Sequence, residues 1–238
     1  MSEKIQLAEV SVDVVRKEIK SLHLSVYPPI GRVRISAPAR MKLETIRVYA
    51  IGKLKWIREQ QRKFREQKRE TPREYIQRES HYLWGKRYLL NVTVADKAPA
   101  IQLLHSRIHL QVRPNTTTDQ REAIFNEWLR KTLREQLEPL LKKWEGILKV
   151  KASGWGVRRM KTKWGSCNTV AKRVLFNTEL VKKPKESLEY VVIHELSHLI
   201  ERRHNDRFIE VLNKSLPNWR QHRNHLNALP LDPQFWRS

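Results

Sequence analysis

The sequence predicts an α+β protein with a β-rich N-terminal half and a C-terminal half built around helices and a small antiparallel sheet. In the first forty residues, apolar residues alternate with polar ones, which is the period-two pattern of half-buried strands. Beyond residue 116, apolar residues recur at helical spacing. A chain of 238 residues suffices for one large domain or two small ones, and we place the boundary near 113–118.

Residues 1–115 are expected to form the β-rich region, with a basic helical segment inserted near 43–70. The segments 22–27 and 32–36 flank a turn that contains two prolines and a glycine, so we expect them to pair as a hairpin. Between 43 and 70 the apolar spacing becomes helical and Lys and Arg dominate the other face, with Gly52 a candidate break between two helices. Further strands are expected at 87–94 and 101–112.

Residues 116–238 are expected to form a second domain. It begins with a threonine-rich N-cap cluster at 116–119, after which a long helix should run to Leu148, with a kink at Pro139. A second helix is expected after the start signals Pro184 and Ser187, because Leu188, Val192, Leu196 and Leu199 mark a buried apolar face. We expect 158–167 and 174–177 to form the antiparallel strands of the small sheet, and no internal repeat is legible.

The chain is strongly basic, with 48 Lys+Arg against 25 Asp+Glu and a formal net charge of +23. Such a field attracts nucleic acids, nucleotides, acidic membrane surfaces or acidic proteins, although a solvated basic surface explains it equally well. A single cysteine, Cys167, excludes an internal disulfide framework and suits a reducing compartment. The N-terminus has no apolar leader core and no apolar run could span a bilayer, so we expect a cytoplasmic protein without membrane partners.

The segment 191–208, VVIHELSHLIERRHNDRF, carries the strongest chemical pattern. His194 and His198 lie four residues apart, so on a helix both imidazoles can reach one zinc ion at about 2.0–2.1 Å. Glu195 projects beside the ion, where it can take a proton from water whose pKa zinc lowers to about 7. On an otherwise apolar helix these polar groups would be costly without a partner, which a metal would supply.

A catalytic zinc takes three protein ligands and leaves one position open. His204 follows His194 by ten residues, which is the offset of the third histidine in H-E-x-x-H-x-x-G-x-x-H, but Glu201 stands where that pattern has glycine. Asp206 and Glu210 are alternative third ligands. In the competing interpretation, the two histidines are hydrogen-bonded core residues and the glutamate lies on the surface. That interpretation requires the whole pattern of H-E-x-x-H and a further histidine to have arisen by coincidence.

The basic stretch 158–167 is a second candidate site. If it is a strand, Arg159, Lys161 and Lys163 share one face. An edge strand beside a metal-binding helix can bind an extended peptide, and its cationic face could equally hold phosphates. An ordinary hairpin with a basic outer face has the same spacing. Cys167 has no legible Cys–His–acid arrangement, so we expect it to be structural or supporting.

These motifs resemble the YgjP-like metal-dependent hydrolases, which are classed with the zincin metallopeptidases. The resemblance covers almost the whole chain and rests on the segments 31–38, 56–57 and 85–90 and, more specifically, on 164–167, Asn177, Leu180, Pro184, 190–198, His204 and Phe208. It implies a zincin-like C-terminal domain, His194, His198 and His204 as zinc ligands, and Glu195 as general base. We expect substrate contacts from Trp164, Gly165 and Ser166 together with Arg159, Lys161 and Lys163.

We favour a zinc metallopeptidase that cleaves peptides or proteins with zinc-activated water, leaving only the oxyanion donor to be found, with His222 and His225 as candidates. The main alternative is a nucleoside-triphosphate pyrophosphatase, because cleavage of uridine triphosphate has been attributed to the resembling group. The basic face favours that alternative, whereas the sequence lacks a phosphate-binding loop and a carboxylate cluster for Mg²⁺. A nucleic-acid-docked protease similar to the more distant SprT-like proteases would also use the charge. A purely nucleic-acid-binding protein with a structural zinc lacks a supporting motif.

Overall fold

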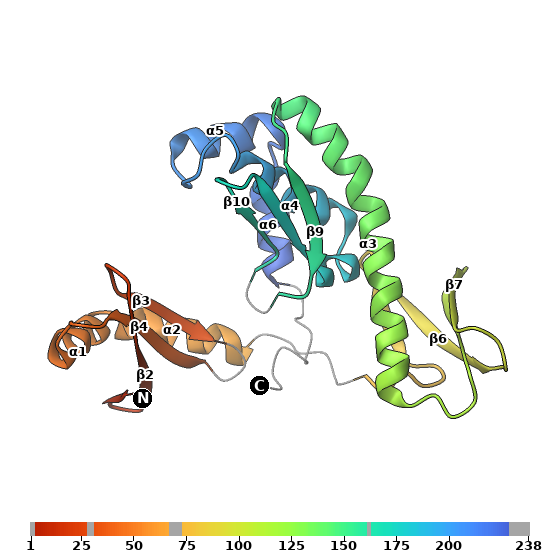
Figure 1. Cartoon of the computed structure of the whole chain (residues 1–238), viewed down its shortest axis with the longest axis horizontal. Coiled ribbons are helices and arrows are strands. Elements are labelled where there is room, and N and C mark those ends of the chain that lie inside the picture. The colour runs from red at the N-terminus through yellow and green to blue at the C-terminus, as the bar shows by residue number, and fades with distance from the viewer. Residues whose placement is uncertain (1–2, 28–30, 67–72, 161–162, 229–238) are drawn as a thin grey trace. The chain divides into compact units, whose positions relative to one another are not determined.

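The computed structural model describes residues 3–27, 31–66, 73–160 and 163–228 (Figure 1). Of these, residues 3–66 form one compact unit and residues 73–228 form a second. We call them the N-terminal unit and the C-terminal unit. Strands and helices are largely segregated along the chain, which confirms the α+β class.

The N-terminal unit is a four-stranded sheet with two helices packed on one face. Its strands lie in the order β1-β2-β4-β3, with a parallel central pair and antiparallel outer pairs. Ile46, Ala50 and Ile57 from the helices are fully buried against the apolar face of the sheet. The elements are β1 (Glu3–Leu7), β2 (Val10–Lys17), β3 (His23–Tyr27), β4 (Arg32–Pro38), α1 (Leu43–Gly52) and α2 (Leu54–Glu66), so the expected hairpin and the helix break at Gly52 are confirmed.

The C-terminal unit begins with a second sheet that repeats the topology of the first. Its order is β5-β6-β8-β7, again with a parallel central pair and antiparallel outer pairs. This structural repeat is not legible in the sequence, because many different side chains can satisfy the same strand pairing. The strands are β5 (Ser80–Leu83), β6 (Lys86–Val94), β7 (Ala100–Leu104) and β8 (Arg107–Val112).

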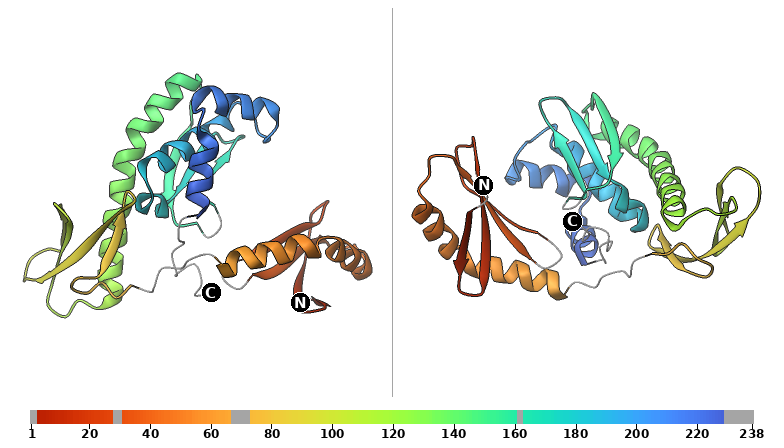
Figure 2. Two further views of the ribbon diagram at one scale, coloured as in Figure 1. Left: turned by 180° about the vertical axis from the view of Figure 1, so that it is seen from behind. Right: turned by 60° about the horizontal axis from the view of Figure 1, so that its bottom comes forward.

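Helix α3 (Thr118–Leu148) joins this sheet to the rest of the unit, and Figure 2 shows it running alongside both. It starts with a capping box in which Thr117 and Gln120 bond reciprocally, as the threonine cluster predicts, and it continues through Pro139. Phe125 at its first turns packs on Tyr75 and His81, with ring centroids 5.5 and 4.5 Å apart. The second sheet therefore shares one hydrophobic core with the helices that follow, and the boundary expected near 113–118 falls inside this compact unit.

The third sheet is mixed rather than antiparallel. Strand β11 (Arg173–Asn177) pairs antiparallel with β10 (Gly165–Asn168), as predicted for 174–177, and parallel with β9 (Gly154–Arg158). The stretch 158–167 is not one strand, because β9 ends at Arg158 and β10 begins at Gly165.

Asn177 supplies the physical reason for this interruption. Its buried side-chain amide donates to the carbonyls of Met160 and Lys163 at 2.9 and 2.7 Å and accepts from the Met160 amide at 3.3 Å. These bonds occupy backbone groups that a strand would need for its ladder. The alternating cationic face of Arg159, Lys161 and Lys163 therefore does not form, and Lys161 lies outside the described residues.

A short 3₁₀ helix, η1 (Thr178–Lys182), leads from β11 to α4 (Lys185–Ser197), the helix that carries the H-E-x-x-H pattern. The second sheet holds this junction through its β5–β6 turn: the amides of Trp84 and Gly85 donate to the carbonyls of Val181 and Lys182 at 2.8 and 3.2 Å. Gly85 has a left-handed backbone conformation with φ at +76°, and a Cβ atom there would lie 2.9 Å from the Pro184 side chain. Two more helices, α5 (Asp206–Ser215) and α6 (Trp219–Ala228), complete the unit.

We predict that a fragment of residues 73–228 folds cooperatively and that a fragment of residues 116–228 does not. The shorter fragment loses the second sheet, so Phe125 and the neighbouring core of α3 become exposed to water. Each large side chain that loses its buried contacts costs about 2–5 kcal/mol. The loss of several together is as large as the whole free energy of unfolding of a typical domain, about 5–15 kcal/mol. Urea titrations followed by circular dichroism measure both fragments; equal cooperative unfolding of the two would contradict the shared core.

Candidate metal centre

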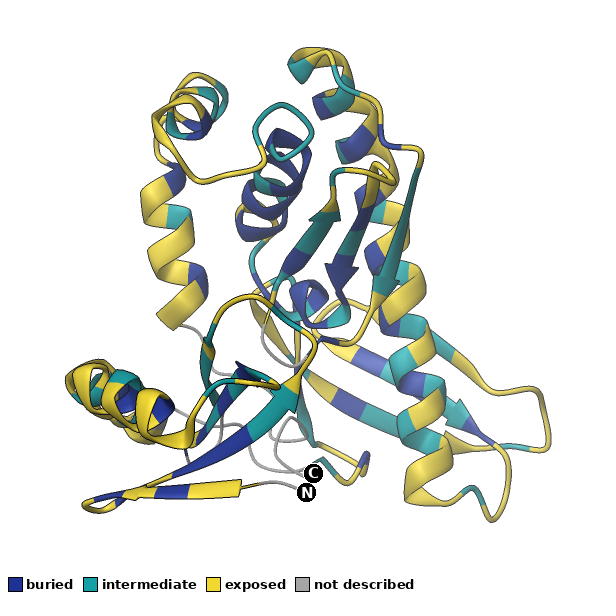
Figure 3. Cartoon of the chain, turned by 60° about the vertical axis from the view of Figure 1, so that its left-hand side comes forward, coloured by how far each residue is buried: buried dark blue, intermediate teal, exposed yellow. Residues whose placement is uncertain are grey.

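Helix α4 is buried on nearly all sides, between α3, α5, α6 and β10. In Figure 3 it is coloured as buried over most of its length, whereas α6 is largely exposed. Its apolar residues, among them Leu188, Val192 and Leu196, are fully buried. The predicted helix is thus confirmed, with His198 as its C-cap residue, and its burial places His194 and Glu195 in a poorly solvated environment.

Three histidines converge at the C-terminal end of α4. One ring nitrogen from each of His194, His198 and His204 lies within 4.8 Å of the others, and this is the sole such cluster among the described residues. The chain turns back after α4 so that His204 arrives just before Asn205, whose side chain caps α5 by accepting the Phe208 amide at 3.1 Å. Asp206 and Glu210, the alternative third ligands, are not part of the cluster.

The geometry of the three histidines fits a tetrahedral metal ion. The Nε2 atoms of His194 and His204 lie 3.2 Å apart, and two nitrogens on one tetrahedral zinc lie about 3.4 Å apart. The Nδ1 atom of His198 lies 3.2 Å from the Glu201 carbonyl, to which it can donate, so that its Nε2 keeps a free lone pair. Such a set of imidazole nitrogens is the donor chemistry that zinc prefers.

Burial favours the neutral form of His194 and His198, which is the form of imidazole that binds metals. It lowers the pKa of His194 to about 3, with the nearby His198 and His204 as further causes. Burial also lowers the pKa of His198. Tyr190, one turn before His194, places its hydroxyl 3.5 Å from the His194 Nδ1 atom.

Phe208 forms the floor beneath the three histidines. Its ring stacks on His198 at a centroid distance of 4.7 Å and meets His194 and His204 edge to face at 5.1 and 4.8 Å. The side chain is 1% exposed, so it restricts the rotamers of all three rings. Its place four residues after His204, one helical turn away, is the sequence signal that corresponds to this role.

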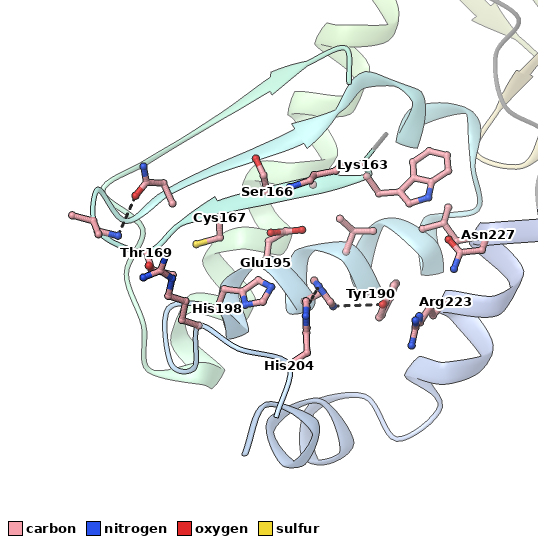
Figure 4. A pocket seen from close by; sticks show the side chains of 18 residues that line it. Lys163, Ser166, Cys167, Thr169, Tyr190, Glu195, His198, His204, Arg223 and Asn227 are labelled. Atoms are coloured by element: carbon pink, nitrogen blue, oxygen red, sulfur yellow. Dashed lines mark hydrogen bonds between the residues drawn. The ribbon is translucent and has the colours of Figure 1, made fainter. Parts of the chain in front are cut away.

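Glu195 is buried beside the three histidines. Glu195 is 6% exposed, and this burial raises the pKa of its carboxyl to about 7, while the positive charge of Lys163 lowers that pKa. Figure 4 shows the carboxylate on the side of the pocket that β10 lines, next to Ser166 and Cys167. A carboxyl with such a pKa is suited to exchange protons near neutral pH.

Gly165 leaves the space that this carboxylate occupies. A Cβ atom at residue 165 would lie 2.7 Å from both Cγ and Oε1 of Glu195, closer than real contacts allow. Of the residues expected to contact substrate, Gly165 therefore has a packing role as well: β10 and α4 can approach only because it has no side chain.

The three histidines and Glu195 line a cavity of about 780 Å³ that lies between β10, α4, the turn after α4, and α6. Of the residues predicted to contact substrate, Lys163, Trp164, Gly165 and Ser166 line this cavity, whereas Arg159 is not among the lining residues. Cys167 also lines it, and burial, together with Glu195, raises the pKa of its thiol to about 11. A thiol with that pKa is protonated at neutral pH, which fits a structural residue and not a nucleophile.

Arg202, Arg223 and Asn227 line the cavity although the sequence patterns did not single them out. His222 and His225, the expected oxyanion donors, are not among the lining residues, and α6 turns Arg223 toward the cavity instead. The sequence feature that could have indicated these residues is the seven-residue spacing of Trp219 and Leu226, which are both buried and mark α6 as a helix. On that helix, Arg223 and Asn227 lie one turn apart.

The sequence profile of the YgjP-like family, described as a metallopeptidase domain, matches residues 20–229. The chain belongs to this family. Among solved structures, the metallopeptidase zymogen abylysin of Pyrococcus abyssi is similar at 20% identity and a TM-score of 0.36, over 37% of this chain and 90% of that one. No curated protein matches the chain in sequence. Within the described residues, every helix is too short or too polar to cross a membrane.

We predict that Gly165→Ala lowers the free energy of unfolding by about 1–3 kcal/mol, because the new methyl group overlaps the buried Glu195 side chain. Gly146→Ala is the matched control: Gly146 lies inside α3 with open space around it, so the same change should stabilise the protein by about 0.5–1 kcal/mol. Thermal unfolding of both variants measures the difference. An unchanged melting temperature for Gly165→Ala would mean that Glu195 is free to move away.

Proposed function

We propose that this YgjP-like protein is a zinc-dependent metallopeptidase in which His194, His198 and His204 hold the ion and Glu195 is the general base. The observation that carries the proposal is the placement of a buried carboxyl with a raised pKa beside three convergent imidazoles in an open cavity. A zinc ion in such a site supplies Lewis-acid polarisation and makes water acidic near neutral pH.

The protein's own groups would perform the proton transfers. Glu195 accepts a proton from the attacking water and returns it to the amine that leaves when the peptide bond breaks. Its burial favours the protonated form after the first transfer, so the second can follow at neutral pH. Tyr190 lines the same cavity and is the candidate donor to the oxyanion that develops on the carbonyl.

The position of β10 supports a peptide substrate. It is an edge strand of the described sheet, paired only with β11, and its residues Gly165–Asn168 line the cavity. An extended peptide can add to such an edge through main-chain hydrogen bonds, which would hold its backbone across the histidines.

A nucleoside-triphosphate pyrophosphatase is the second candidate, favoured by Lys163, Arg202 and Arg223 in the cavity wall. Glu195 is the one acidic residue among the described lining residues, so the cavity offers no carboxylate cluster for the Mg²⁺ that accompanies triphosphates. This composition favours the peptidase.

A docking role for the basic surface is compatible with the peptidase proposal. Exposed Lys55, Arg58, Arg62 and Arg65 surround a shallow hollow along α2 in the N-terminal unit. If this surface docks on nucleic acid, as in a SprT-like protease, the affinity should fall steeply with salt concentration.

Glu195→Gln should lower peptide hydrolysis by about 10²–10⁴-fold, because the amide cannot accept the proton. Zinc content should stay unchanged, since Glu195 is not part of the histidine cluster. Turnover of a mixed peptide library and metal analysis of the same preparation measure both effects. Undiminished cleavage by the variant would exclude Glu195 as the base.

His204→Ala should weaken zinc binding by more than about 100-fold, because loss of a ligand exceeds the effect of removing a supporting residue. Glu210→Ala is the control, since Glu210 lies on α5 outside the cluster. Competition with a zinc-binding dye measures both affinities. Loss of zinc from Glu210→Ala and not from His204→Ala would show that the third ligand is misassigned.

A further inference from the structure

The cavity beside the histidines is lined by an excess of positive charge. Lys163 comes from the loop before β10, Arg202 from the turn after α4, and Arg223 from α6. Glu195 is the one acid that the described residues contribute to the lining. Three separate segments thus bring cations to one cavity.

None of these three cations forms an ion pair with a described residue, and all three are exposed. Elsewhere basic side chains are paired: Arg32 with Asp13 at 2.6 Å and Lys143 with Glu189 at 2.7 Å. The cationic field of the cavity is therefore available to a ligand.

The cations lie on different sides of the histidines. Arg223 reaches the cavity from α6 and Lys163 from the loop before β10, and both line it together with His194 and His198. In Figure 4, Arg223 lies by Tyr190 and Asn227 on α6, whereas Lys163 lies by Ser166 on the β10 side. A ligand spanning the histidines would pass both.

We propose that the cavity selects peptides that carry an acidic side chain next to the cleaved bond, with Arg223 as the main specificity determinant. A guanidinium binds a carboxylate through two parallel hydrogen bonds, which a lysine cannot do, and the Asn227 amide lies one turn further along the same face of α6. Peptides with lysine or arginine at that position are disfavoured, because they would meet uncompensated like charge. This inference rests on the proposed peptidase function.

The test uses quenched fluorescent peptides that place Glu, Gln or Lys at each of the positions flanking the cleaved bond. With the zinc-loaded full chain, kcat/KM should be roughly 10- to 100-fold higher for Glu than for Gln at one position, as expected for a hydrogen-bonded charge pair. In Arg223→Gln this ratio should fall to near one, and in Arg223→Glu the preference should change to Lys. Arg220→Gln is the matched control: Arg220 lies on the same helix, over Trp219 and bonded to Asn213, and should leave the ratio unchanged.

Three outcomes would overturn the inference. They are a wild type without any preference for Glu, a preference that survives in both Arg223 variants, and a preference lost equally in Arg220→Gln. Cleavage of uridine triphosphate in place of every peptide would assign the cations to phosphate and overturn it too. If no peptide is cleaved, the peptidase function itself fails, which separates the two conclusions.

Discussion

The removal of α4 from water is the constraint on which the site depends. In solvent, imidazoles and a carboxylate would titrate at ordinary pKa values and make no common site. Packed between three helices and a strand, His194 and His198 lose their tendency to protonate, while Glu195 gains one. The same desolvation thus favours neutral imidazoles at His194 and His198 and raises the pKa of the Glu195 carboxyl to about 7, so the protonation states of these groups depend on the stability of the surrounding core.

Two residues that make no chemical contribution hold this arrangement together. Gly165 allows β10 to approach α4 so closely that the Glu195 carboxylate has a defined place. Asn177 bonds the loop between β9 and β10, which fixes where β10 begins and so where Gly165 and Ser166 lie. The β10 segment shapes the wall of the cavity, in addition to any contact that it makes with substrate. This packing role explains why the uncharged residues 164–167 belong to the sequence pattern of the site.

The charge of +23 acquires a more specific meaning at the cavity. A global excess of cations attracts every kind of anion, but the three cations that line the cavity, none of them ion-paired to a described residue, act most strongly on molecules that enter the site. The general attraction raises the encounter rate, and the local charges discriminate between substrates. The basic α2 in the other unit could serve attraction without any part in that discrimination.

The sequence by itself determined the features that depend on local spacing: the α+β class, the capped start of α3, α4 with its H-E-x-x-H pattern, and His204 as the third histidine. Only the tertiary structure decided which distant segments meet. It interrupted the expected strand at 158–167 through Asn177 and joined the second sheet to α3 in one core. It also used the same topology in two four-stranded sheets, and it placed Arg223 in the cavity where His222 and His225 were expected. Spacing records periodicity along one element, whereas these features arise from contacts between residues far apart in the chain, which no local pattern encodes.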